Sequence, residues 1–126
     1  MNNVIELLAR VFLGHIFVLA GFGKLGEGYA GTAGYMDSMG VPGGLLPLVI
    51  ALEIIGGLMV IMGFKVKWAA YALAGFSIVA GVIFHSNFAD QMQMILFMKN
   101  ISIAGGLLLL SVHGASEFSV DKQLAR

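Results

Sequence analysis

Four long apolar segments follow one another along this chain, and they constrain its fold more than any other feature. They cover residues of about 4–24, 44–63, 68–86 and 98–114, with a polar tail over 115–126. A helix that crosses a membrane needs about 20 mostly apolar residues. Membrane-spanning strands alternate polar and apolar residues, and these segments do not. We therefore predict an all-α membrane protein, with four transmembrane helices in a compact antiparallel bundle with short loops, as one domain over residues 1–126.

The composition agrees with a membrane location and excludes several functions. Charged residues make up 11% of the 126 residues, whereas a soluble domain carries about 25%. Seven basic residues balance seven acidic ones, so no charged surface is expected to attract nucleic acid. The chain contains no cysteine, which removes disulfides, thiolate metal sites and thiol nucleophiles. A disordered tail, a nucleic-acid binder and an ordinary cytosolic enzyme are all excluded.

The longest connection, residues 25–41, is rich in glycine. Its middle, residues 29–39, predicts a short interfacial helix between the first and second spans. We expect Tyr35, Met36 and Met39 to face lipid there.

The lysines and arginines predict the orientation of the bundle. Four spans place both termini on one side of the membrane. That side carries the larger basic group, namely Lys65, Lys67, Lys122 and Arg126. The opposite side carries only Lys24 and Lys99. Because basic residues favour the cytoplasmic side, we expect both termini in the cytoplasm of a multi-pass protein.

Three of the ionisable residues inside the spans form a candidate intramembrane polar cluster: Arg10, His15 and Glu53. Such residues cost about 2.5–3.5 kcal/mol each to insert, and they usually face the bundle interior. At about 1.5 Å per residue, Glu53 and His15 lie near the midplane, within reach of the long Arg10 side chain. We predict an Arg10–Glu53 pair, with His15 as a third member or alternative partner. The pair is either structural or includes a carboxylate that handles a proton or a ligand.

A second candidate cluster lies on the opposite, periplasmic side. It contains Lys24, His85, Lys99 and Asn100, which end or begin three of the spans. Its members either anchor the helices at the interface or form a small site for an anion or a head group.

Small residues lie beside these polar residues at helical spacing. On the first span Gly14 and Gly21 form one stripe with Arg10, Phe17 and Lys24. Similar stripes are predicted on the other spans: Glu53 with Gly56, Gly57 and Val60; Ala74, Ser77, Gly81 and His85; and Lys99, Ile103, Gly106, Leu110 and His113. Small residues let helix backbones approach closely, so we expect these stripes to face inward.

The three histidines do not predict a metal centre. His15 lies near the middle of a span, while His85 and His113 lie at opposite faces. They cannot gather on one zinc ion or on one haem. We expect no tightly bound metal or cofactor, and the sequence contains no self-contained catalytic constellation, which leaves enzymatic activity open.

Together these residues resemble the DoxX family of small bacterial inner-membrane proteins. The resemblance covers nearly the whole chain. Its residues are Arg10, Gly14, Phe17, Gly21, Lys24, Tyr35, residues 40–42, Glu53, Gly56, Gly57, residues 84–88, Lys99, Asn100, Ser119 and Asp121. It implies a four-helix membrane bundle. Some relatives resemble subunits of membrane oxidoreductases, including a thiosulfate:quinone oxidoreductase and a complex tied to oxidative-stress defence.

Three functions follow as hypotheses. The first is a binding or scaffold module, an accessory subunit of a membrane assembly. The second is a quinone-linked subunit of an oxidoreductase, in which a bound quinone or a membrane redox partner supplies the redox chemistry that a cysteine-free chain lacks. The third is a small proton-linked transporter that acts as a homo-oligomer through Glu53. The lipid bilayer is the partner common to all three.

Overall fold

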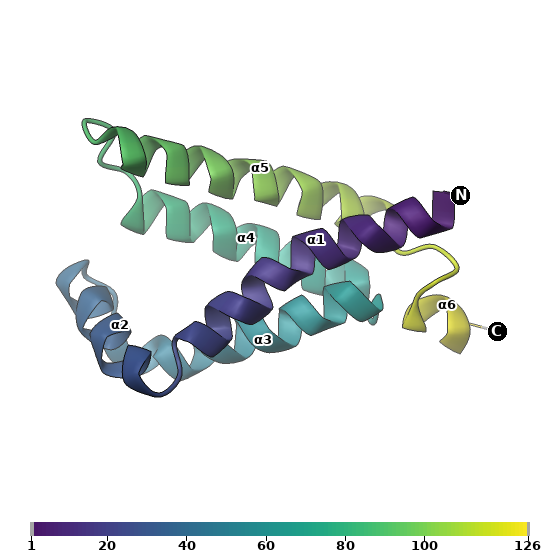
Figure 1. The fold of residues 1–126 in the computed structure, drawn as a ribbon, viewed down its shortest axis with the longest axis horizontal. Coiled ribbons are helices and arrows are strands. Elements are labelled where there is room, and N and C mark those ends of the chain that lie inside the picture. Colours follow the sequence, from purple (N-terminus) through teal and green to yellow (C-terminus); the bar gives the residue numbers. More distant parts are fainter. Residues whose placement is uncertain (1, 126) are drawn as a thin grey trace.

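The computed structural model describes residues 2–125 and shows a chain built of helices (Figure 1). The elements are α1 (Asn2–Gly23), α2 (Glu27–Ser38), the 3-10 turn η1 (Gly43–Leu45), α3 (Leu46–Met62), α4 (Val66–Phe84), α5 (Gln91–His113) and α6 (Val120–Leu124). Four of them, α1, η1 with α3, α4 and α5, are long and apolar enough to cross a membrane. The predicted bundle of four long helices, with a short helix after the first, is confirmed.

The four long helices pack as two close pairs, α1 against α3 and α4 against α5, and α3 also lies beside α4. Both ends of the described chain lie at the same end of the bundle (Figure 1). At that terminal end α1 approaches α5, where Gly106 lies against the side chain of Leu13. Toward its other end α1 runs away from α5 (Figure 1). The bundle is therefore closed at the terminal end and looser at the opposite end.

The fourth long helix begins at Gln91, seven residues before the predicted start. Its N-cap is Asp90, whose carboxylate accepts a hydrogen bond from the Met92 amide at 3.0 Å. A side-chain oxygen at this position satisfies one of the free amides of the first turn. Glutamine and methionine then favour the helix.

Glycine sets the distance between α1 and α3. A Cβ atom added to Gly14 would lie 2.6 Å from the carbonyl oxygen of Gly57, and one added to Gly57 would lie 2.8 Å from the carbonyl oxygen of Gly14. The two backbones therefore touch directly. The inward stripe predicted on α1 is confirmed, because Arg10, Gly14, Phe17 and Gly21 are the buried residues of this helix.

Helix α2 covers the end of the bundle opposite the termini. Met36 is buried and packs with Leu46 and Ile50 of α3. The ring of Tyr35 stacks on Phe84 of α4 with centroids 5.5 Å apart. The expectation that Met36 faces lipid is wrong, because the glycine-rich connection lets α2 fold back onto α3.

We expect Gly14→Ala to destabilise the bundle, because its methyl group must push α1 and α3 apart. Overpacking of this kind costs about 1–3 kcal/mol. The matched control is Gly75→Ala on α4, where a Cβ atom meets nothing within 4 Å. Thermal melting of the purified protein in mild detergent measures both. A Gly14→Ala protein that melts like the Gly75→Ala control would contradict a backbone contact at this crossing.

Candidate functional site

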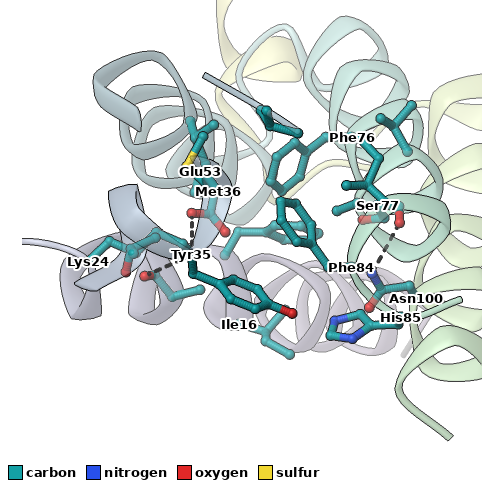
Figure 2. Close-up of a pocket in the computed structure, with 18 of the residues that line it drawn as sticks. Ile16, Lys24, Tyr35, Met36, Glu53, Phe76, Ser77, Phe84, His85 and Asn100 are labelled. Carbon is teal, nitrogen blue, oxygen red and sulfur yellow. Dashed lines mark hydrogen bonds and ion pairs between the residues drawn. The ribbon is translucent and has the colours of Figure 1, made fainter. Parts of the chain in front are cut away.

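A cavity of about 510 Å³ lies between the helices at the end of the bundle away from the termini (Figure 2). Its walls come from α1, α2, α3, α4 and α5 and are mostly apolar. The side chains that bring nitrogen or oxygen to the lining are Lys24, Thr32, Tyr35, Glu53, Ser77, His85 and Asn100. Pockets for small molecules typically measure about 300–1,000 Å³ and combine apolar walls with a few polar groups. This cavity has both properties.

An ion pair forms one wall of the cavity. The Nζ atom of Lys24, just beyond the end of α1, lies 2.7 Å from Oε1 of Glu53 on α3. The Glu53 side chain is only 5% exposed and that of Lys24 is 25% exposed. Lys24 also donates to the carbonyl oxygen of Ala20 at 3.3 Å. Gly21 allows the approach, because a Cβ atom there would lie 3.3 Å from Cβ of Glu53.

A second polar group lies across the cavity from the ion pair (Figure 2). The side-chain amide of Asn100 on α5 donates to the carbonyl oxygen of Ser77 on α4 at 3.1 Å. The Nδ1 atom of His85 lies 3.2 Å from Oε1 of Gln93. The rings of Phe76 and Phe84 lie between this group and the ion pair (Figure 2). The cavity thus has polar groups on two sides and aromatic rings between them.

The structure does not bring the first predicted cluster together. The predicted contact between Arg10 and Glu53 is wrong, because each has another partner: Glu53 pairs with Lys24, and Nε of Arg10 lies 2.6 Å from Oε1 of Glu6. Depth alone suggested the pairing, and it overlooked a carboxylate one turn earlier on the same helix. His15 is exposed on the outer face of α1, and its Nδ1 contacts the carbonyl oxygen of Phe12 at 2.6 Å.

The second predicted cluster is largely assembled. Lys24, His85 and Asn100 line the same cavity, and Glu53 joins them there. Lys99 is exposed and takes no part. The predicted stripe on the fourth span is wrong at its ends, since Lys99 and His113 are both exposed. The helix buries Leu110, which the stripe included, and Ala104 and Leu107, which it did not.

The cavity also contains residues that the sequence did not indicate as part of a site, above all Tyr35, Phe76 and Phe84. Tyr35 was expected to face lipid. Its stacking on Phe84, together with the burial of Met36, shows that α2 covers the bundle. The one signal for these residues in the sequence was the family resemblance, whose ordered set of residues includes Tyr35 and Phe84.

The buried Arg10 organises the terminal end of the bundle. It is 1% exposed and donates to the carbonyl oxygens of Ile61, at 2.7 Å, and Phe118. The other oxygen of Glu6 accepts a hydrogen bond from the hydroxyl of Ser116 at 2.6 Å. These contacts tie the C-terminal tail to α1 and α3.

Asp121 of the tail caps the start of α4. Its carboxylate accepts hydrogen bonds from the amides of Lys65, at 2.6 Å, and Val66, at 3.0 Å. A carboxylate favours the positive end of a helix. The tail from Ser116 to Asp121 therefore packs over the terminal end of the bundle.

The chain belongs to the DoxX family, whose family model matches residues 5–86. It is similar to the inner membrane protein YqjF of Escherichia coli (strain K12), with 46% identity over 98% of this chain and 95% of YqjF. It is also similar to the inner membrane protein YphA of the same organism, with 34% identity over 95% of this chain and 90% of YphA. A third relative is named "Putative oxidoreductase CatD", from Bacillus subtilis (strain 168), with 31% identity over 90% of this chain and 81% of CatD.

No solved structure shows a significant match to the chain. The family, the inner-membrane relatives and the four long apolar helices agree. The chain is a multi-pass inner-membrane protein of the DoxX family.

We expect a strong energetic coupling between Lys24 and Glu53. Removing one member of a buried pair leaves an uncompensated charge and costs about 3 kcal/mol. Lys24→Met should cost more than Glu53→Gln, because an unpaired lysine near a helix end can extend to the interface, whereas Glu53 cannot. Thermal melting in detergent measures each single variant and the double variant. The double variant should regain much of the loss.

Lys99→Met is the matched control, because this lysine is exposed on α5, and its melting temperature should stay that of the wild type. Strictly additive losses in the double variant would show that Lys24 and Glu53 do not interact.

Proposed function

We propose that this chain is a binding subunit of a membrane redox assembly and that its cavity takes a lipid-soluble ring of the quinone class. One observation carries the proposal: an apolar, aromatic-walled cavity inside a membrane bundle has hydrogen-bonding groups on two sides. A quinone is an apolar ring with polar oxygen atoms at opposite positions, and it dissolves in the bilayer around the bundle. The relative named "Putative oxidoreductase CatD" supports the proposal.

The cavity residues would bind and orient such a ring. Phe76 and Phe84 offer aromatic faces, which stabilise a ring by stacking or edge contacts. Lys24 can donate a hydrogen bond to one ring oxygen from beside Glu53. The ring itself supplies the redox chemistry, and a protein partner exchanges the electrons. The chain's own contribution is then a dry, shaped site with fixed polar groups.

The packing below the cavity favours binding over transport. The core cluster that contains Phe17, Val60, Leu73 and Leu107 is buried inside the bundle. It lies between the cavity and the terminal end, where the tail closes the bundle. A substrate that entered the cavity would meet packed side chains instead of a passage.

A saturable binding curve for a short-chain benzoquinone tests the proposed function. We expect one quinone per chain when the purified protein in lipid nanodiscs is titrated calorimetrically. Ala80→Phe should abolish binding, because Ala80 lines the cavity and a ring at this position occupies part of it. Ala72→Phe is the matched control, because Ala72 is exposed on the same helix.

A quinone that binds neither the wild type nor the control would overturn the proposal. So would binding that survives in the Ala80→Phe variant.

We further propose that both termini lie in the cytoplasm. They lie at one end of the bundle (Figure 1), which also carries Lys65, Lys67 and Lys122. Arg126, the fourth basic residue assigned to this side, lies outside the described residues. The other end carries Glu27, Asp37 and Asp90 in and around α2 and the α4–α5 loop. Lysine-rich ends remain in the cytoplasm.

Fusions to the C-terminus test this orientation. A fluorescent protein should be bright in that position, and alkaline phosphatase should be inactive, because it folds only outside the cytoplasm. Bright fluorescence with inactive phosphatase supports the proposal. The reverse pair of results would place the termini in the periplasm.

A further inference from the structure

We infer that the cavity selects the reduced, hydroxyl-bearing form of its ring ligand, a quinol or related dihydroxy aromatic, over the oxidised quinone. This inference rests on the proposed function and adds the oxidation state that the site recognises. The inference is based on the hydrogen-bonding atoms of the cavity that the protein's own hydrogen bonds leave free for a ligand. Lys24, Asn100 and the cavity hydroxyls can donate to either form of the ring, whereas Oε2 of Glu53 can only accept.

The available oxygen on the ion-pair side belongs to Glu53. Its Oε1 atom binds Lys24, and its Oε2 atom has no protein partner among residues 2–125. No buried side-chain nitrogen or oxygen in this part of the chain lacks a hydrogen-bond partner. Oε2 is therefore not fully buried, and since Glu53 lines the cavity, a ligand in the cavity can reach this oxygen. A carboxylate accepts hydrogen bonds and cannot donate one, so this oxygen requires a donor on the ligand.

The opposite side offers an acceptor and a donor. The amide nitrogen of Asn100 donates one of its two N–H groups to the carbonyl oxygen of Ser77 at 3.1 Å, which leaves its second N–H group and its Oδ1 for a ligand. This assignment is firm, because a carbonyl oxygen requires the donating end of the asparagine amide. His85 directs Nδ1 to the acceptor Oε1 of Gln93 at 3.2 Å.

The two oxidation states of the ring differ in what they offer these atoms. Quinone oxygens only accept, so a quinone can take hydrogen bonds from Lys24 and Asn100 but leaves Oε2 of Glu53 without a donor. A quinol hydroxyl can donate to Glu53 and accept from Lys24 at the same time. Its second hydroxyl can donate to Asn100. The hydroxyls of Ser77 and Tyr35 both donate and accept, so they suit either form.

The expected selectivity is large. Leaving a buried acceptor without a donor costs more free energy than a hydrogen bond contributes on balance. Sites built to bind a hydroxyl reject analogues that lack it. We expect the quinol to bind about tenfold more tightly than the quinone, or better.

Anaerobic calorimetry on the full-length protein in lipid nanodiscs measures this preference with three probes. They are a benzoquinol with one isoprenoid unit, the corresponding quinone, and the quinol dimethyl ether, which keeps the ring oxygens and loses both donors. The quinol should bind most tightly. The ether should bind no better than the quinone.

Glu53→Gln provides the matched variant, because its amide has nearly the same shape and can donate as well as accept. We expect it to lose most of the preference through weaker quinol binding, while quinone binding is kept or improved. Its melting temperature is measured in parallel. If the variant is too unstable to titrate, the comparison of quinol with its dimethyl ether on the wild-type protein decides the question alone.

Each outcome points one way. Quinol binding that is tighter than that of both other probes supports the selection of the reduced form. Quinone or ether binding as tight as quinol binding overturns it and leaves the proposed function standing. Binding of none of the three probes overturns the proposed function, and the inference falls with it.

Discussion

The inward stripe of α1 has a cation at each end, Arg10 within the helix and Lys24 just beyond its last residue, and the hydrocarbon region of a bilayer offers no polar partner. Polar groups at this depth must be satisfied by protein. Arg10 is paired with Glu6 and the backbone carbonyls of Ile61 and Phe118. Lys24 is paired with Glu53. The first set closes the bundle at the terminal end, and the second forms the wall of the cavity at the other end.

The position of the cavity follows from the helix contacts. Gly14 and Gly57 bring α1 and α3 into backbone contact, while α4 and α5 form the second close pair. Leu13 of α1 meets Gly106 of α5 near the terminal end, and the two helices separate beyond that point (Figure 1). Helix α2 covers the space between the pairs, where Tyr35 stacks on Phe84. A tight crossing at one end thus leaves room for a ligand at the other.

The sequence was sufficient for features that depend on hydropathy and helical spacing. The four spans, the inward stripe on α1 and the gathering of Lys24, His85 and Asn100 follow from these two properties. The sequence was insufficient to predict the interaction partners of the buried charged side chains. Arg10 donates a hydrogen bond to a backbone carbonyl oxygen of the tail. Glu53 pairs with Lys24, which lies just beyond the end of the span that carries Arg10. Depth along the membrane normal ranks candidate partners, but rotation about each helix axis and the path of the tail decide among them. Tyr35 and Met36 were missed for the same reason, since α2 folds back onto α3 only through tertiary packing.

Photolabelling in native membranes tests most directly whether the cavity is the binding site for a lipid-soluble ring. The probe is a short-chain benzoquinone that carries an aryl azide, and the labelled residues are mapped by mass spectrometry. The predicted result is labelling confined to the cavity-lining segments, residues 32–36 of α2 and 76–85 around the end of α4, and suppressed by excess unlabelled quinone or quinol. Labelling spread over the lipid-facing residues Phe12, Leu19 and Leu109, and unaffected by the competitor, would contradict it.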